Sequence, residues 1–576
     1  MQSGAMLNVC FEDLNYNDEE LYVILSAIKK KKKYARLNKN TIIEIDDEIA
    51  MKFLKTVEEF DLDVKHLTKA QDKPLYQSLK LLGESDSFID IKTDDVLKNM
   101  LTDIANYKSS DYLPANSLKE VMRDYQIDAF KWIKTLIKYN FCGILADDMG
   151  LGKTLEIISV ILSDGEEKPS LIVCPKSLSY NWRNEFKKWA PDIDVINING
   201  LSLERSQIIK EIDNHKKAVY ISSYDSLRND LDNYIKKKFR FVILDEAQFI
   251  KNHTTLKAKS VKQIASELRF VLTGTPIENT VVDLWSIFDF LMPNYLYNYS
   301  AFKNRYEKNI TQYMDDETIG MLVKKITPFI LRRTKEEVLK NLPEKIETIR
   351  YATMGPEQRK VYEAQLLMTK DLLLSKDKFM ILQSLTRLRQ ISVNPSLFID
   401  DYKGRSAKTD LAIELINDFV RDGHKILLFS QFTSAFDDIE KELQKLGIKY
   451  FILTGKTDAL DRVEMAEAFN EETSAEKVFL VSLKAGGTGL NLIGADIVIH
   501  LDPWWNISAE NQATDRAHRI GQARIVQVIK LVCEDSIEQK VIELQQLKQN
   551  VVDAVIANND ENIIKLSDAD LKYLLS

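Results

Sequence analysis

Two blocks of short apolar runs constrain the fold of this 576-residue chain more than any other feature. The first block contains the runs SLIVCP, AVYISS, FVILDE and FVLTGT; the second contains KILLFSQF, KYFILTG, VFLVSL, DIVIHLD and IVQVIKLV. Each run is predicted to be a strand that stops at polar or small residues, and helical stretches separate the runs. This pattern is typical of parallel sheets that bind ligands at the carboxyl ends of their strands. The sequence therefore predicts an α/β chain with two parallel-sheet lobes.

The regions around the two blocks complete the predicted domain organisation. Residues from Pro293 to about Pro395 look helical and charged, without comparable strands. The N-terminal region is mixed; its run ARLNKNTIIEID predicts two strands around an Asn-Lys-Asn turn. Five parts are predicted: an N-terminal adaptor region (1–112), a first lobe (113–292), a helical insert and inter-lobe linker (293–400), a second lobe (401–545) and C-terminal helices (546–576).

Composition excludes several classes of protein. A formal net charge of −8 argues against a generally basic nucleic-acid coat, so any such contact must be local. The run Lys29 to Lys33 is interpreted as a solvated helix end rather than a nucleic-acid contact. The four cysteines form no CxxC pair, so no disulfide framework or zinc site is predicted. No run is apolar enough to span a bilayer. These features predict a cytoplasmic protein without a membrane partner.

The segment DDMGLGKT resembles a phosphate-binding loop, but Asp147 stands where the P-loop pattern has its first glycine. That position begins the turn and does not touch the γ-phosphate. The later glycines let successive N–H groups and a helix N-terminus point at one anion. Lys153 would then reach the β- and γ-phosphates, and the Thr154 hydroxyl would ligate Mg²⁺. The alternative is a glycine-rich turn closed by an exposed lysine. The loop predicts ATP and Mg²⁺ as cofactors.

Two further motifs follow strands of the first block. In VILDEAQFIKN, Asp245 could hold Mg²⁺ and Glu246 could orient or deprotonate the attacking water. A plain helix N-cap is the alternative interpretation of this pair. In LTGTPIEN, Thr273 and Thr275 are placed to sense the γ-phosphate, and a β-turn is the alternative.

The second block contributes a pair of arginines. In QATDRAHRIGQ, Arg516 and Arg519 are three residues apart, which predicts one face of a helix. They could reach across a cleft to the γ-phosphate as an arginine finger supplied in cis. A surface helix with salt bridges is the alternative.

Seven motifs in order resemble the SWI/SNF-type ATPase family of helicase superfamily two, in its prokaryotic form. They are DDMGLGKT, CPKSLSYNW, DEAQFIKN, LTGTPIEN, LLFSQF, KAGGTGLNL and QATDRAHRIGQ, and the likeness covers roughly residues 118–541. In that family the P-loop opens with Asp. The resemblance implies two RecA-like lobes that bind ATP in their cleft and double-stranded DNA across their shared face.

The same resemblance implies roles for individual positions. Catalytic roles fall on Lys153, Asp245, Glu246, Arg516 and Arg519. Nucleotide contacts fall on Gln126, which would read adenine, and on Asp148, Met149, Gly150, Leu151, Gly152, Lys153, Thr154 and Gln512. Thr154 and Asp245 would hold the metal. DNA contacts fall on Lys176, Ser177, Asn181, Trp182, Arg332, Arg333, Lys484, Gly487 and Thr488. One departure is Gln248, which stands where many members carry His; both side chains can hydrogen-bond across the motif.

The implied function is a DNA-stimulated ATPase that translocates on duplex DNA and displaces bound protein. A strand-separating helicase and a catalytically silent DNA-binding scaffold are the alternatives; the intact P-loop, carboxylate and arginine motifs disfavour the scaffold. Binding should be largely independent of DNA sequence, since no base-reading module is found. We expect a monomer in a bacterial or archaeal cytoplasm, associated with the nucleoid, and the sequence leaves the displaced protein open.

Overall fold

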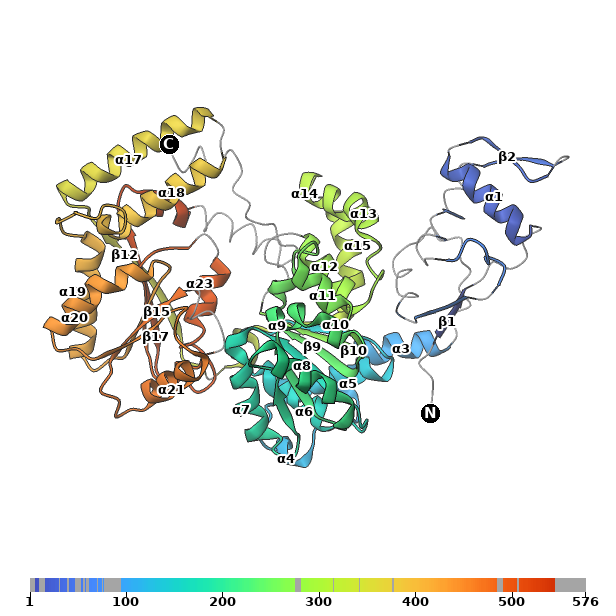
Figure 1. Cartoon of the computed structure of the whole chain (residues 1–576), viewed down its shortest axis with the longest axis horizontal. Helices are drawn as coiled ribbons and strands as arrows, with labels where there is room; N and C mark the ends of the chain where they lie inside the picture. Colours follow the sequence, from blue (N-terminus) through green and yellow to red (C-terminus); the bar gives the residue numbers. More distant parts are fainter. Residues whose placement is uncertain are drawn as a thin grey trace.

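The structure is a computed structural model in which two α/β lobes and a smaller N-terminal part follow one another along the longest axis (Figure 1). It describes residues 6–9, 16–30, 32–38, 41–46, 53–54, 57, 62–69, 71–74, 76, 95–274, 281–313, 315–340, 342–375, 378–483, 490–504 and 507–543. Within these residues no helix has both the length and the apolar character needed to cross a membrane.

The first lobe is built on a seven-stranded parallel sheet, as the first block of apolar runs predicts. Its strand order is β11-β5-β10-β9-β6-β8-β7. The strands are β5 (Gly143–Leu145), β6 (Ser170–Cys174), β7 (Val195–Asn197), β8 (Val219–Ser223), β9 (Lys238–Asp245), β10 (Ala265–Leu272) and β11 (Ile330–Leu331). Residues of β5, β6 and β8 are buried throughout, because helices cover both faces of the sheet.

The helices of the first lobe follow the strands in alternation. They are α4 (Asn116–Lys119), α5 (Asp124–Lys138), α6 (Lys153–Leu162), α7 (Ser179–Trp189), α8 (Ser202–Lys210), α9 (Tyr224–Asn229), α10 (Leu231–Tyr234), α11 (Leu256–Lys262) and α12 (Val281–Leu291). Three more helices, α13 (Tyr299–Phe302), α14 (Lys308–Tyr313) and α15 (Asp316–Ile326), stand beyond α12 (Figure 1). Their apolar side chains join the core of the first lobe.

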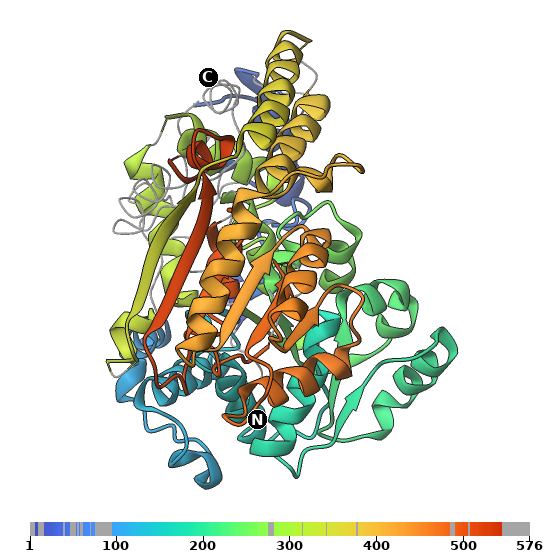
Figure 2. The ribbon, with the colours of Figure 1, turned by 90° about the vertical axis from the view of Figure 1, so that its left-hand side faces the viewer.

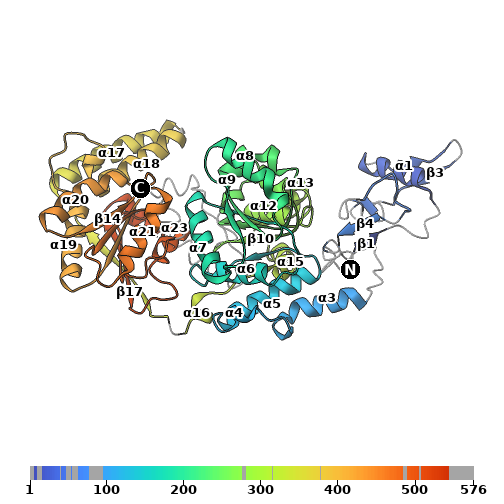
Figure 3. The same ribbon diagram turned by 60° about the horizontal axis from the view of Figure 1, so that its bottom comes forward.

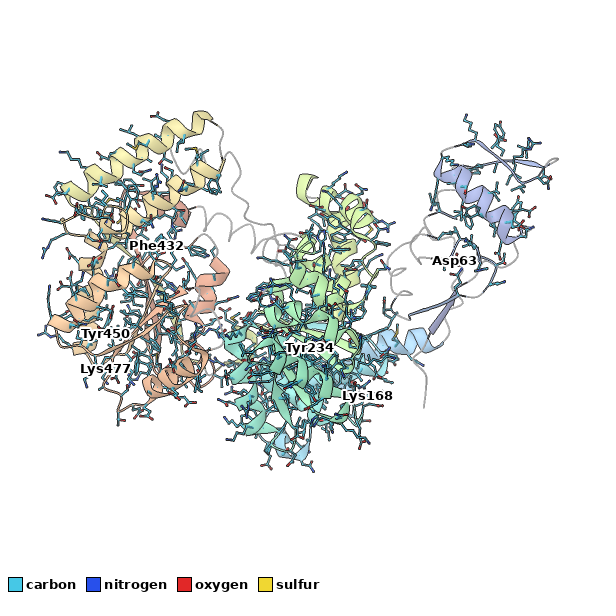
Figure 4. All side chains as sticks on the ribbon, viewed as in Figure 1. Asp63, Lys168, Tyr234, Phe432, Tyr450 and Lys477 are labelled. Carbon is cyan, nitrogen blue, oxygen red and sulfur yellow. The ribbon has the colours of Figure 1, made fainter. Side chains whose placement is uncertain are left out.

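The second lobe is a six-stranded parallel sheet in the order β12-β17-β16-β13-β15-β14. The strands are β12 (Lys345–Ala352), β13 (Ile426–Ser430), β14 (Tyr450–Leu453), β15 (Val478–Ser482), β16 (Ile497–His500) and β17 (Val526–Cys533). Apolar clusters pack on its two faces. The helices are α19 (Ala407–Arg421), α20 (Phe436–Lys445), α21 (Ala459–Asn470) and α23 (Ile507–Thr514). In Figure 4 the labelled Lys168 and Tyr234 belong to the first lobe, and Phe432, Tyr450 and Lys477 to the second.

The prediction that residues 293–395 contain no comparable strand is wrong. β12 lies in that region and pairs with β17 over eight residues, beside it at one edge of the second sheet (Figure 2). Its sequence KIETIRYA is mostly exposed, because an edge strand buries little of its surface. Beyond β12 the prediction of helices is confirmed by α17 (Pro356–Ser375) and α18 (Lys378–Val393), which pack against each other.

The N-terminal part carries the predicted hairpin, with β2 (Tyr34–Arg36) antiparallel to β3 (Ile42–Glu44). It also contains α1 (Asp18–Lys29), the antiparallel pair β1 (Met6–Val9) and β4 (Gln71–Pro74), and α3 (Asp95–Ala105). The Tyr76 hydroxyl donates to the carbonyl of Pro293 at 3.0 Å, which ties this part to the first lobe. Residues 537–543 are helical as predicted; the predicted helices of 546–576 lie outside the described residues.

Candidate active site

The P-loop connects β5 to α6 and owes its shape to two glycines. Gly150 and Gly152 have φ angles of 88° and 91°, in the left-handed region that L side chains rarely adopt. Space is also lacking: a Cβ on Gly152 would lie 2.4 Å from Nε2 of Gln126. The backbone therefore turns tightly and places the N-terminus of α6 at the carboxyl edge of the sheet, where it can receive an anion.

The predicted phosphate ligands lie at the start of α6. Lys153 is the first residue of the helix, and its Nζ donates to the carbonyls of Asp147 at 2.5 Å and Asp148 at 3.3 Å. Thr154 follows it and is half-buried. The ammonium thus stays within the loop, next to the helix N-terminus.

Sheet register brings the second motif to the same edge. Leu145 of β5 pairs with Leu272 of β10, and Leu272 pairs with Asp245 of β9. The P-loop, Thr273 and the Asp245–Glu246 pair therefore all start from one row of the sheet. Thr273 is buried and its N–H donates to Leu145 O at 3.2 Å. Thr275 lies outside the described residues.

Asp245 is half-buried at the end of β9, and two hydrogen bonds hold its carboxylate. Its Oδ2 accepts from Nε1 of Trp182 at 2.9 Å, and its Oδ1 accepts from the N–H of Glu246 at 2.9 Å. Burial and the nearby Glu246 charge raise the pKa of Asp245 to about 7. Such a carboxylate favours a neighbouring cation, which restores its charged form.

Glu246 has a left-handed backbone, with φ 54°, at a position where a non-glycine residue rarely adopts it. Nε2 of Gln248 donates to Oε2 of Glu246 at 2.8 Å. The residue that departs from the family pattern therefore orients the predicted water-activating carboxylate. Strain of this kind is commonly found at functional sites.

Arginines from the second lobe reach this edge of the first. A Cβ on Gly150 would lie 2.6 Å from the Cβ of Arg519, so Arg519 packs directly on the P-loop. Nη2 of Arg516 lies 3.8 Å from Sδ of Met149. Burial lowers the pKa of Arg516, and the charge of Glu246 opposes that effect. Arg516 is only 5% exposed, which does not fit a surface salt-bridged helix.

The local structure around these arginines differs from the prediction. Arg516 and Arg519 do not share a helix face, because α23 ends at Thr514 and both lie in the turns that follow. The N–H of Arg516 bonds to Ala513 O at 3.2 Å, and its carbonyl accepts from Leu492 N at 3.0 Å. A turn that is hydrogen-bonded to Leu492 takes the place of the predicted helix face, and both side chains lie against the first lobe.

Two residues predicted to contact DNA have side chains that point into the first lobe. Trp182 is 1% exposed and lies behind Asp245, so its side chain has no access to DNA. Arg333 is turned into the first lobe, where it bonds to the buried carboxylates of Asp147 and Glu156. Burial opposes the charge of Arg333, but these two carboxylates outweigh burial and raise its pKa. Both residues support the site from inside.

The other predicted contacts are placed as follows. Lys176 and Arg332 are exposed. Ser177, in the 3-10 turn before α7, and Asn181, in the first turn of α7, are half-buried. Lys484, Gly487 and Thr488 lie outside the described residues. Their DNA contacts stay predictions.

Nucleotide contacts of side chains away from the loop also stay predictions. Gln126 is buried, its Oε1 accepts from Arg123 N at 3.0 Å and its Nε2 donates to Leu151 O at 2.9 Å. Its amide therefore fixes the P-loop backbone. Gln512 is half-buried in α23.

Within the loop, Oδ2 of Asp148 accepts from the N–H of Lys335 at 3.0 Å, a contact that the sequence did not predict.

Fold and site together define a class: a two-lobed P-loop protein of the helicase type, with arginines of the second lobe against the nucleotide loop of the first. Comparisons with known proteins identify the family. Residues 125–397 match the SNF2-related domain, residues 407–521 the helicase conserved C-terminal domain, and residues 1–114 the bacterial SNF2 helicase associated family. The chain belongs to the SNF2 family of helicase superfamily two, in its prokaryotic form.

Individual relatives agree with this family. The chain is 39% identical over 463 residues to an uncharacterized ATP-dependent helicase of Mycoplasma pneumoniae, covering 79% of this chain and 44% of the relative. It is 32% identical over 535 residues to the TATA-binding protein-associated factor MOT1 of Saccharomyces cerevisiae, covering 79% of this chain and 28% of that protein. The chain thus spans less than half the length of these relatives. A solved Sulfolobus solfataricus SWI2/SNF2 ATPase core in complex with dsDNA is 36% identical, with a TM-score of 0.39, covering 78% of this chain and 96% of that one.

Proposed function

We propose that this protein is a DNA-stimulated ATPase that couples ATP hydrolysis to translocation on double-stranded DNA and so displaces bound protein. The observation that carries the proposal is the position of Arg519 and Arg516 of the second lobe against Gly150 and Met149 of the first. A site completed by both lobes can convert a change in nucleotide state into motion between them.

The residues at this edge of the first sheet fit Mg-ATP. The tight turn at Gly150 and Gly152, the N-terminus of α6 and the side chain of Lys153 would hold the phosphates. Thr154 and Asp245 would hold Mg²⁺, which neutralises the charge that develops on the phosphates. Glu246, oriented by Gln248, would position or deprotonate the attacking water. The two arginines would stabilise the transition-state charge from the other side.

Duplex DNA is the partner that we propose. Phosphate contacts need exposed basic side chains, hydroxyls and N–H groups, and Lys176 and Arg332 supply exposed charge while the chain as a whole is acidic. Such contacts make binding largely independent of base sequence. The relative MOT1 is named a TATA-binding protein-associated factor, which supports a DNA-bound protein as the displaced object. We propose a monomer that works in the cytoplasm near the nucleoid.

The first test measures phosphate release with no nucleic acid, duplex DNA, single-stranded DNA and RNA. We expect stimulation by duplex DNA above the other three. Equal rates in all four conditions would remove DNA from the proposal.

The second test separates translocation from strand separation. The same protein and ATP are given a triplex, from which a translocase displaces the third strand, and a simple forked duplex. We expect displacement from the triplex and an intact fork. Efficient unwinding of the fork would favour the strand-separating helicase.

A further inference from the structure

The segment between β11 and β12 lies between the two lobes. It includes α16 (Lys335–Val338), which Figure 3 shows below the gap between the second lobe and the first. We refer to residues 332–340 as the linker. The linker contacts the P-loop on one side and the arginine segment, residues 515–519, on the other.

Hydrogen bonds of main-chain N–H groups fasten the linker and the end of β11 to the P-loop. The N–H of Ala146 donates to Leu331 O at 2.7 Å, and the N–H of Asp148 donates to Arg333 O at 3.0 Å. The N–H of Lys335 in turn donates to Oδ2 of Asp148 at 3.0 Å. One contact at the end of β11 and two in the linker thus fix the backbone, up to Lys335, against the nucleotide loop.

The side chain of Lys335 points the other way, into the second lobe. Its Nζ donates to Oδ1 of Asp515 at 2.6 Å and to the carbonyl of His518 at 2.5 Å. Asp515 precedes Arg516, and His518 precedes Arg519. The Lys335 side chain is 9% exposed. A buried ammonium needs such partners, and charge-assisted bonds of this length are among the stronger hydrogen bonds in proteins.

Apolar contacts reinforce the same junction. Leu339, just after α16, is buried with Tyr125 of α5 and Leu151 of the P-loop. Val338, Leu342 and Ile520 pack against this cluster; Ile520 directly follows Arg519. The linker is therefore packed against the P-loop and the arginine segment at once.

We propose that Lys335 is a positioning residue for hydrolysis: it holds the arginine segment at the distance from the P-loop at which Arg516 and Arg519 can act. This inference rests on the proposed ATPase function. Lys335 touches neither arginine head group in the described contacts; it acts through the carboxylate before one arginine and the carbonyl before the other. A displacement of about 1 Å in a catalytic group costs on the order of 100-fold in rate.

The test compares kcat and KM for ATP, with saturating duplex DNA, in wild type, Lys335→Met and Asp515→Asn. We expect kcat to fall by about 100-fold in Lys335→Met and less in Asp515→Asn, with KM changed by less than about threefold. Lys340→Met is the matched control, because Lys340 is an exposed lysine of the same linker; its kcat should stay within about twofold. A kcat of Lys335→Met within about threefold of wild type would overturn the inference.

A double variant separates positioning from general stability. If Lys335 acts through the arginine segment, Lys335→Met added to Arg519→Ala should lower kcat little further. Multiplication of the two losses would show an independent, structural role and overturn the inference. Asp515→Asn leaves the volume of the carboxylate unchanged and serves in the same cycle if Lys335→Met does not fold.

A readout without ATP separates this inference from the proposed function. Small-angle scattering of the nucleotide-free protein should give a larger radius of gyration for Lys335→Met than for wild type and Lys340→Met, since the lobes lose one of their connections. Equal radii would overturn the role of Lys335 in lobe placement. A wild-type protein without ATPase activity would instead contradict the proposed function, whatever the radii.

Discussion

Neighbouring arginines of the linker, Arg332 and Arg333, should have opposite roles. Arg332 is exposed, whereas Arg333 bonds to Asp147 of the P-loop and Glu156 of α6, both fully buried. We expect Arg333→Met to destabilise the first lobe and leave DNA binding by the folded protein intact. We expect Arg332→Met to weaken DNA binding and leave stability unchanged. The two variants differ by one position and carry the same change in composition.

The magnitude follows from the buried charges. Burial and the charge of Asp147 raise the pKa of Glu156, and Arg333 opposes that rise. Arg333→Met would leave the buried carboxyl groups of Asp147 and Glu156 without their cationic partner. Breaking a buried pair in this way costs roughly 3–5 kcal/mol. Exposed arginines usually contribute less than about 0.5 kcal/mol, which is the expectation for Arg332→Met.

The destabilisation by Arg333→Met should depend on pH. Burial already raises the pKa of Asp147, and losing Arg333 raises it further, so the folded variant binds a proton that the unfolded chain binds only at lower pH. A group whose folded pKa is raised makes the folded state more stable as pH falls. The destabilisation by Arg333→Met should therefore be largest near pH 8 and shrink toward pH 5.

Urea unfolding followed by tryptophan fluorescence measures the stability of the first lobe, because this lobe contains Trp132, Trp182, Trp189 and Trp285. The salt dependence of duplex binding measures the contribution of each arginine to DNA binding. One lost phosphate contact should reduce the slope of log K against log salt by about 0.9 in Arg332→Met and by nothing in Arg333→Met. Equal unfolding midpoints, or a reduced slope in Arg333→Met, would refute the assignment.

Three further predictions concern single side chains. Glu246→Gln should bind a fluorescent ATP analogue with Mg²⁺ as wild type does, yet release phosphate about 10²–10⁴ times more slowly; lost binding would make Glu246 structural. Trp182→Phe removes a bond that lowers the pKa of Asp245, so the acidic limb of kcat/KM against pH, which reports the free protein, should move up by about one unit. Burial lowers the pKa of His500 to about 3, so the unfolded chain binds a proton at this histidine below pH 6.5 and the folded protein does not. The free energy of unfolding should therefore fall as pH falls. Urea unfolding should show that wild type loses about 2 kcal/mol more than His500→Gln between pH 7 and 5.

Most of the fold could be predicted, because buried parallel strands produce apolar runs that end at polar residues. β12 could not be found in this way. Its residues Lys345, Glu347 and Arg350 make an edge strand look like part of a charged helical region, and only its pairing with β17 shows where it belongs. Pairing between strands about 180 residues apart has no local signal in the sequence.

In the site, motif order predicted which segments meet at the sheet edge, and register confirms their shared row. The direction of individual side chains could not be predicted from the sequence. Trp182 was predicted to contact DNA because its motif, CPKSLSYNW, resembles a DNA-contacting segment of the family. In the structure its indole N–H donates to Asp245 at 2.9 Å. An aromatic ring that lies in one turn of a helix can face solvent or the core, and the choice depends on the neighbouring strand.

Charge alone does not predict where the basic side chains of the linker lie. Arg332, Arg333 and Lys335 look like one basic segment suited to a phosphate backbone. In the structure the first is exposed, the second enters the first lobe and the third enters the second lobe. Asp147 explains the difference, because its carboxylate draws Arg333 inward. A glycine at that position would offer no such acceptor. The aspartate that departs from the general P-loop pattern is thus a connection between the nucleotide loop and the linker, and a substitution there should affect the placement of both lobes as well as the loop.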